Sequence, residues 1–351
     1  MKINLVTYHW SNNLGALIQA LSLKDFINKN FNAVIEYNNY LPKKLIKRER
    51  MSQINSQNFS FLNKIFKKKL KLYFWKKNIG NIKSPISNTS LFDKDIYIYG
   101  SDEIWNYSNP FFGFDPYFFG DLNKKKKIAY GCSIGNANIK LNSINQEQKI
   151  KQNLQSFNAI SVRDSNSFSF IQNLIKLEPE IVVDPCFLST PDVLFKYNTK
   201  FKEKFEKKNF ILIYGDFFSK NEINKIINFS KKENLSIISV SYVNRWADLN
   251  IIDINPADLV FFIKSSTFVI TSMFHGVMLS YKFNKQFWYS EDPYRKNKLK
   301  YFLEKLNLKN QQIEFLSVNQ IDYKYKEKEF KLWKKKSGDF LLNNIKNVIE
   351  N

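Results

Sequence analysis

Short apolar segments alternate with amphipathic segments along most of the chain. The apolar segments of the first half are rich in Ile, Val and Tyr and have the composition of buried strands; they lie at residues 3–8, 33–37, 95–100, 127–133, 159–164 and 180–185. Residues 15–27, "GALIQALSLKDFI", instead have apolar positions at helical spacing. This alternation predicts an α/β fold with parallel sheets.

The second half repeats the alternation after a segment, residues 187–208, that we interpret as a linker. Strands are predicted at 210–216, 235–242, 267–272 and 286–290, and helices at 221–233, 255–266, 275–283, 298–306 and 337–351. We therefore expect two Rossmann-type domains, 1–190 and 209–335, followed by a C-terminal helix, 336–351. Ligands of such sheets bind beyond the carboxyl ends of the strands, so the cleft between the domains is the expected site.

Residues 41–90 interrupt this pattern. They are basic and aromatic, show no strand signal, and predict amphipathic helices in an insertion of the first domain. The net charge of +22 is almost entirely lysine, scattered through a chain that is rich in Lys, Asn, Ile and Phe. Compositional bias explains this charge best, attraction to an anionic membrane or substrate ranks second, and nucleic-acid binding ranks third. We expect no nucleic-acid partner, and a peripheral membrane contact through the insertion.

Other features narrow the class of protein. No apolar run approaches the roughly twenty residues of a membrane span, and the N-terminus lacks the pattern of a signal peptide. Cys132 and Cys186 lie far apart without metal-ligand spacing, which favours a reducing cytoplasm. We expect neither a metal nor a bound cofactor.

His275 is one of only two histidines, and it lies in "ITSMFHGVML", where a predicted strand meets a predicted helix. The first turn of a helix has unpaired N–H groups and the positive end of the helix dipole, which suits an anion. Ser272 precedes the turn, and Gly276 lets a ligand approach the backbone. A histidine here can contact a phosphate or act as an acid, although most lone histidines only cap or pack a helix.

Three further corners carry polar residues. Asp102 and Glu103 follow the strand 95–100, where either serves equally well as a general base or a helix cap. In "YHWSNNLGALIQA", Asn12 and Asn13 precede Gly15 in a loop that suits sugar hydroxyls or an ordinary turn. Arg163 ends the strand 159–164, where it can bind an anion or pair with Asp164 or Asp184.

These motifs, taken in order, resemble the polysaccharide pyruvyl transferase family over nearly the full chain. The similarity rests on "SNNLGALIQALSL", "YGSDEIWN", "AYGCSIGN", "SVRD", "VVDPCFL", "TSMFHGVMLSYKFNKQF" and "KLKYFLEKLNL". The resemblance implies a GT-B-like fold of two facing Rossmann-type domains. It also implies transfer of pyruvate from phosphoenolpyruvate to sugar hydroxyls of a bacterial surface polysaccharide, such as a capsule, exopolysaccharide or lipopolysaccharide, or of its lipid-linked precursor.

The corner of the second domain departs from the Arg-Leu-His of many family members. Met273, Phe274 and His275 stand there, as in a branch that has Ser-Phe-His-Gly, and Lys298 replaces an arginine of that branch before the last helix. The resemblance carries His275, Arg163 and Lys298 over as candidates. Together with the corner residues above, we expect His275, Asp102 and Glu103 to be catalytic. We expect Arg163, Lys298, Gly276 and Ser272 on the donor side, and Asn12, Asn13, Gly15 and Trp105 on the acceptor side.

Two alternatives remain open from the sequence. The same cleft can bind the diphosphate of a nucleotide sugar at the helix that begins at His275, which would make the protein a GT-B-type glycosyltransferase of capsule or lipopolysaccharide synthesis. The chain can also be a non-catalytic glycan- or membrane-binding protein that kept the fold. The sequence indicates neither the acceptor sugar nor the oligomeric state.

Overall fold

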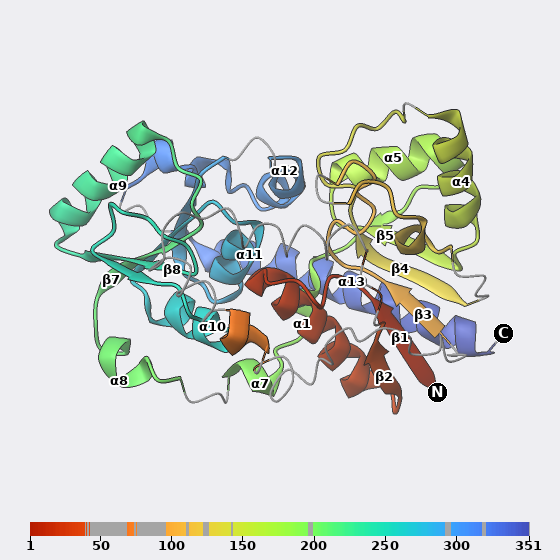
Figure 1. Ribbon diagram of the computed structural model, residues 1–351, viewed down its shortest axis with the longest axis horizontal. Coiled ribbons are helices and arrows are strands. Elements are labelled where there is room, and N and C mark those ends of the chain that lie inside the picture. The colour runs from red at the N-terminus through yellow and green to blue at the C-terminus, as the bar shows by residue number, and fades with distance from the viewer. Residues whose placement is uncertain are drawn as a thin grey trace.

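The computed structural model confirms two parallel-sheet α/β domains. It describes residues 1–38, 40, 42, 69–73, 75, 96–109, 112–121, 126–141, 143–195, 199–291, 296–317 and 321–350, apart from the side chains of 296–298, 325 and 326. The first sheet has the order β2-β1-β3-β4-β5-β6 and the second β11-β10-β7-β8-β9, with every pairing parallel. Figure 1 shows the two sheets in separate lobes with α1 between them.

The strands lie where the apolar segments predicted them, with one addition. Those of the first sheet are β1 (Lys2–Val6), β2 (Val34–Tyr37), β3 (Ile96–Tyr99), β4 (Lys127–Cys132), β5 (Ala159–Val162) and β6 (Glu180–Ile181). Those of the second are β7 (Phe210–Tyr214), β8 (Ser236–Val240), β9 (Leu249–Ile251), β10 (Phe268–Thr271) and β11 (Gln286–Tyr289). The strand β9 was not predicted, because three residues at a sheet edge are too few to show a period.

Helices follow the strands as the alternation requires. The longer ones are α1 (Leu14–Asn30), α4 (Ile144–Gln155), α5 (Ser165–Ile175), α9 (Lys220–Glu233), α10 (Pro256–Ser265), α11 (Phe274–Lys282) and α12 (Lys296–Lys305). Three one-turn helices lie at the predicted linker 187–208. They are α6 (Pro185–Leu188), which overlaps its start, and α7 (Asp192–Phe195) and α8 (Lys202–Phe205), which lie within it. Polar side chains cap the N-termini of several helices: Asn13 caps α1, Asp164 caps α5 and Asn255 caps α10.

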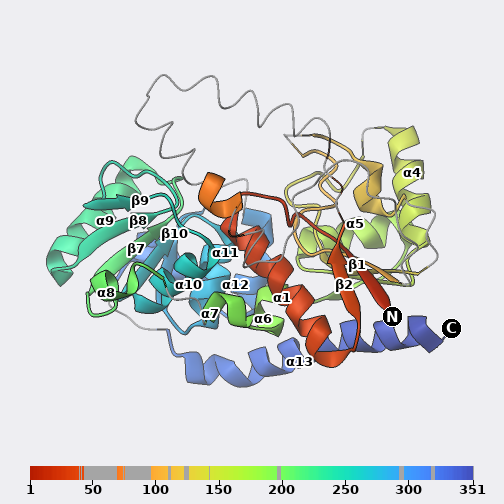
Figure 2. The same cartoon turned by 60° about the horizontal axis from the view of Figure 1, so that its bottom comes forward.

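The C-terminal helix is longer than the sequence indicated. We predicted a helix over 336–351, whereas α13 runs from Tyr323 to Glu350. Figure 2 shows it passing beneath both lobes. Near its start the Tyr323 hydroxyl donates to the Lys285 carbonyl beside the second sheet, and farther along the Trp333 indole N–H donates to Ile181 O of the first sheet at 2.8 Å. The N-terminal part of α13 is rich in lysine, so packing against the two domains stabilises this part more than its own apolar residues do.

One continuous apolar core joins the two domains. It includes Leu17 of α1, Ile98 of β3, Leu212 of β7 and Val277 of α11, all buried. The helix α1 packs against α6, α10 and α11, so a helix of the first domain lies against the second. This packing brings the carboxyl ends of the two sheets together.

Little of the predicted insertion can be compared with the structure. Of residues 41–90, only 42, 69–73 and 75 are described, so its amphipathic helices and its membrane contact stay predictions. Residues 69–73 and 75 are helical, and Lys71 Nζ lies 2.7 Å from the buried Asp258 Oδ2 of α10. This short piece therefore packs on the second domain, although it precedes β3 of the first domain in the chain.

Candidate active site

Each sheet has one point where its strand order reverses, and ligands of such sheets bind there. In the first sheet this point lies between β1 and β3, and in the second between β7 and β10. The residues that follow these strands include Thr7, Ser101 and Asp102 on one side and Gly215 and Ser272 on the other. The site therefore lies between the two carboxyl edges.

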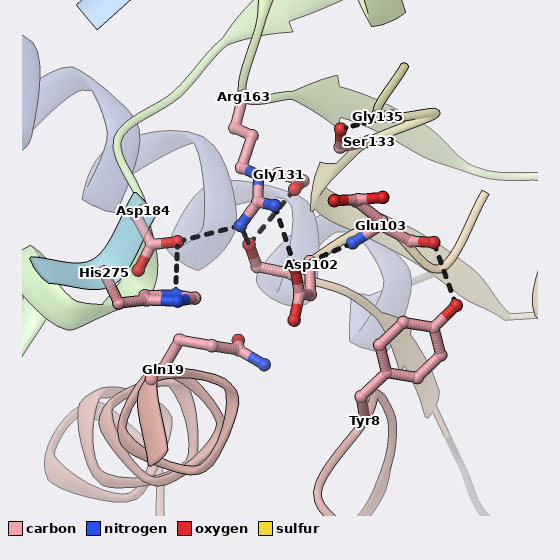
Figure 3. A network of polar contacts seen from close by, with 12 residues as sticks. Tyr8, Gln19, Asp102, Glu103, Gly131, Ser133, Gly135, Arg163, Asp184 and His275 are labelled. Atoms are coloured by element: carbon pink, nitrogen blue, oxygen red, sulfur yellow. Dashed lines mark hydrogen bonds and ion pairs between the residues drawn. The ribbon is translucent and has the colours of Figure 1, made fainter. Parts of the chain in front are cut away.

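His275 belongs to the second domain, and its side chain contacts Asp184 of the first domain. It lies in the first turn of α11, its side chain is 5% exposed, and its Nε2 lies 3.5 Å from Asp184 Oδ2 (Figure 3). Asp184 follows β6 of the first domain and caps α6 by accepting from the Cys186 N–H at 3.0 Å. The carboxylate thus comes from the corner that begins α6, and it meets the imidazole across the domain boundary.

Asp184 is ionised in this setting. Burial alone would raise its pKa, but His275, Arg163 and the Cys186 N–H outweigh burial and hold the pKa well below its usual range. Charge-assisted hydrogen bonds favour the carboxylate form. A fixed negative charge therefore stands behind His275.

Arg163 is ion-paired on both sides. Its Nη1 donates to Asp184 Oδ2 at 3.1 Å, its Nη2 donates to Asp102 Oδ1 at 2.9 Å, and its Cζ lies 4.5 Å from the centre of the Phe274 ring. Burial disfavours its charge, but Asp102 and Asp184 more than compensate and raise its pKa. Of the two ion-pair partners that the sequence offered, Asp184 is the one found. Asp164 instead accepts from Ser133 and Ser167.

The two neighbouring carboxylates point in different directions (Figure 3). Asp102 faces Arg163, and its side chain is 13% exposed. Glu103 turns away, accepts from Asn106 Nδ2 at 2.9 Å, and lies so close to Gly135 that a Cβ there would be 2.4 Å from Glu103 Oε2. Asp102 has a φ of 80°, a turn that separates the directions of the two side chains. Only Asp102 lies beside the His275–Asp184–Arg163 network.

Of the residues expected on the donor side, Ser272 and Gly276 form the corner of the second domain, whereas Arg163 lies at the end of β5 in the first domain. Ser272 Oγ accepts from the Phe217 N–H at 3.3 Å. A Cβ on Gly276 would lie 2.1 Å from Thr271 Oγ1, so glycine is needed for α11 to pack on β10. Lys298 lies in α12, but its side chain is outside the described part of the structure.

The residues expected on the acceptor side are more dispersed. Asn12 lies in the partly buried loop before α1, and Asn13 Oδ1 accepts from the Gly15 N–H at 3.0 Å. A Cβ on Gly15 would lie 2.4 Å from His275, so this glycine allows α1 to meet α11. Trp105 is 0% exposed and its indole N–H donates to Phe118 O at 3.0 Å. Trp105 is a core side chain here, and its indole N–H is already bonded within the protein.

Sequence comparison decides the family. A profile described as polysaccharide pyruvyl transferase matches residues 13–290, which is well over half of the 351 residues. The chain belongs to the polysaccharide pyruvyl transferase family. It is therefore a transferase, which sets aside the non-catalytic alternative.

Of three similar solved structures, the first has a TM-score above 0.5 and supports the fold of this pyruvyl transferase. The UDP-GlcNAc 2-epimerase from Neisseria meningitidis, bound to UDP-GlcNAc, is 10% identical with a TM-score of 0.52 over 100% of both chains. The enzyme from Methanocaldococcus jannaschii is 8% identical, covering 99% of this chain and 100% of its own, with a TM-score of 0.49. The E. coli heptosyltransferase WaaC with ADP is 8% identical over 85% and 90%, with a TM-score of 0.37. No curated protein matches. The GT-B-like architecture is confirmed.

Two buried polar residues near these corners were not among the predicted site residues. Asp184 was considered only as an ion-pair partner of Arg163, although "VVDP" places it at the end of a strand like the other candidates. Gln19 was not considered at all, although it lies four residues after Gly15 and so on the same face of α1. The strand-end position and the helical spacing were the signals that could have found them.

The remaining two properties concern groups of metal ligands and membrane-spanning helices. Among the residues that the structure describes, no three His, Cys, Asp or Glu side chains are grouped as metal ligands would be. In the same part of the chain, no helix has the length and apolar character needed to cross a membrane.

Proposed function

We propose that this pyruvyl transferase moves the pyruvate group of phosphoenolpyruvate onto two hydroxyls of one sugar, which belongs to a bacterial surface polysaccharide or its lipid-linked precursor. The observation that supports it most is the meeting of His275 with Asp184, Arg163 and Asp102 across the domain boundary. It joins a proton carrier, a fixed cation and a carboxylate within one network.

The first step adds a proton to the methylene carbon of phosphoenolpyruvate. His275 is the acid, since its Nε2 lies 3.5 Å from the Asp184 carboxylate and it stands in the first turn of α11. The N–H groups of that turn favour the phosphate of the donor. Protonation turns the carbon that carries the phosphate into an oxocarbenium-like centre.

The second step forms the bonds to the sugar. One hydroxyl oxygen attacks the cationic carbon while its proton passes to Asp102, and the C–O bond to phosphate breaks. The second hydroxyl of the sugar then attacks the same carbon and closes the ketal. Of the two protons lost by the hydroxyls, one replaces the proton that His275 gave and the other leaves with the phosphate.

Arg163 acts as a fixed cation at the boundary in this proposal. It is shared between Asp102 and Asp184, so an incoming anion competes with Asp102 for it. When Asp102 takes the hydroxyl proton, its attraction for Arg163 falls, and the guanidinium can then stabilise the departing phosphate.

The test is a coupled assay of phosphate release from phosphoenolpyruvate, with and without a panel of glycan acceptors, followed by mass spectrometry of the product. The expected result is acceptor-dependent release together with an acceptor that has gained pyruvate less one water. Acceptor-independent release, or a product without added pyruvate, would contradict the proposal.

A nucleotide sugar is the second candidate donor. The corner Ser272–His275 followed by α11 offers the helix N-terminus on which a diphosphate can lie. Calorimetric titration with phosphoenolpyruvate and with UDP-GlcNAc separates the two candidates. Tight binding of UDP-GlcNAc with no response to phosphoenolpyruvate would favour the glycosyltransferase.

A further inference from the structure

Gln19 is a buried side chain whose amide oxygen accepts no hydrogen bond from the residues that the structure describes. Its residue is 0% exposed, and its Nε2 donates to Thr7 Oγ1 at 2.9 Å. Thr7 Oγ1 in turn donates to the Ser101 carbonyl at 3.2 Å, so it must accept from Gln19. This chain of bonds places the amide nitrogen toward Thr7, and Gln19 Oε1 has no partner among the described residues.

Gln19 lies on the face of α1 that meets His275, and its amide is bonded through Thr7 toward the strand end that carries Asp102. Gly15 and Gln19 are four residues apart and share one face of α1, and the backbone of Gly15 lies directly against His275. At its other side Gln19 is bonded through Thr7 to Ser101, whose neighbour Asp102 binds Arg163. Figure 3 accordingly shows the Gln19 amide between His275 and Asp102, at the end of a side chain that rises from α1.

The chemistry of an amide oxygen restricts what can bind there. A buried acceptor is rarely left unpaired in a folded protein, and it is satisfied only by a group that has a proton to donate. The phosphate and carboxylate of phosphoenolpyruvate present oxygen acceptors, which an amide oxygen repels. A sugar hydroxyl has the required proton.

We propose that Gln19 is an acceptor-binding residue, with Oε1 accepting a hydrogen bond from one hydroxyl of the sugar. The inference rests on the proposed function and deepens it. Asp102 faces the hydroxyl that attacks first, while Gln19 holds the second hydroxyl with its proton in place until the ketal closes. The ligand class is therefore a sugar with two hydroxyls on neighbouring or next-but-one carbons.

Two variants test this assignment against a matched control. Gln19→Met keeps the shape and removes the acceptor, whereas Gln19→Glu keeps an acceptor oxygen and adds negative charge. The control Tyr37→Phe removes one buried hydrogen bond to α1, from the Tyr37 hydroxyl to Ala20 O at 3.0 Å, away from His275. The probes are phosphoenolpyruvate and a panel of methyl glycosides that contain such hydroxyl pairs, with binding measured by calorimetry and KM by phosphate release.

In Gln19→Met we expect the Kd and KM of the glycoside to rise about ten-fold, the value of one hydrogen bond, with those of phosphoenolpyruvate unchanged within about two-fold. Gln19→Glu should retain the glycoside and weaken phosphoenolpyruvate, which provides the test if Gln19→Met does not fold. Tyr37→Phe should alter neither ligand.

Three results would overturn the inference. The first is an unchanged glycoside affinity in Gln19→Met, which is expected if Oε1 only binds a buried water. The second is an equal loss of affinity for both ligands in Gln19→Met, and the third is a wild type that binds none of the glycosides. Failure of the proposed function is distinguishable. A wild type that binds glycosides in a Gln19-dependent way but not phosphoenolpyruvate would refute the donor and leave the role of Gln19 intact.

Discussion

The carboxyl edges of the two sheets differ in how they use charge. The edge of the first sheet carries Asp102, Arg163, Asp164 and Asp184, all buried or partly buried and bonded to one another or to nearby hydroxyls. The edge of the second sheet carries the exposed Asp216, Ser272 and the start of α11, and His275 is its side chain that meets the network. The first edge is rich in carboxylates, and its one arginine is already shared by two of them.

This difference in charge suggests that the two edges bind different ligands. An edge with three aspartates and one arginine is a poor place for a ligand that carries two anionic groups, because like charges repel within a buried site. A helix N-terminus with a histidine is a better one. We therefore expect the second domain to hold the anionic donor, with Arg163 meeting its phosphate across the boundary, and the first domain to hold the hydroxyls of the acceptor. Each prediction below tests one side of this comparison.

The largest effect is expected on the second edge, in His275→Ala. Loss of the acid should lower transfer by about 100- to 10,000-fold, the usual range for general acid–base catalysis. Phosphoenolpyruvate affinity should fall as well, since the ring also faces the donor. Steady-state kinetics, calorimetry and a melting curve would measure this. Full activity in a folded variant would remove His275 from the mechanism.

On the first edge, Asp102→Asn should lower kcat by about 100-fold or more and leave phosphoenolpyruvate bound, because the base is lost and an anion competitor of the donor is neutralised. Glu103→Gln is the matched control, since Glu103 points away from the network and bonds Asn106. Equal loss of kcat in both variants would show that the direction of the side chain does not select the base.

Arg163→Ala tests whether the first edge is stable without its cation. The buried Asp184 and the partly buried Asp102 would lose their shared partner, so the free energy of unfolding should fall by about 3–5 kcal/mol. The exposed Arg245→Ala should change it by no more than about 0.5 kcal/mol. Denaturation in urea gives both values. A loss in Arg163→Ala as small as that of the control would mean that the pairs are not coupled.

Gly15→Ala tests the contact between the edges. The new Cβ would lie 2.4 Å from the His275 side chain, so either α1 or the imidazole must move. We expect a loss of about 1–3 kcal/mol from overpacking, together with reduced transfer. Gly338→Ala in α13 is the control, because its Cβ would meet only the end of the Phe26 ring at 3.1 Å. Unchanged activity in Gly15→Ala would show that the two edges need not touch.

The smallest effect is the acid dependence of stability through Asp184. Its pKa in the folded state is below its usual range, so its stabilisation is complete above the unfolded value of about 3.9 and is lost as the pH falls further. Wild type should therefore lose stability below about pH 4 more steeply than Asp184→Asn, by at most about 1.4 kcal/mol per pH unit. Urea unfolding between pH 6 and pH 3 measures both slopes, and parallel slopes would argue against an ionised, paired Asp184.

The sequence by itself determined the fold class and the chemistry of the corners. Period and composition predicted the strands around Ile98 and Ile270 and the helix after Gly15, because burial of both faces of a parallel sheet selects continuous apolar runs. They also placed Asp102, Arg163 and His275 at the ends of strands. These properties are local, so a short window of residues contains them.

Only the tertiary structure decided which of these corners meet. The pairing of His275 with Asp184 joins residues from two sheets, and the docking of the lysine-rich start of α13 depends on surfaces that its own sequence does not contain. Side-chain direction was also beyond the sequence: Asp102 and Glu103 are adjacent carboxylates, yet a left-handed turn at Asp102 points them apart. Trp105, expected at the surface for a sugar, lies in the core because its indole N–H finds a partner at Phe118 O. Contacts between residues far apart in sequence depend on how whole elements pack, and no local pattern encodes that.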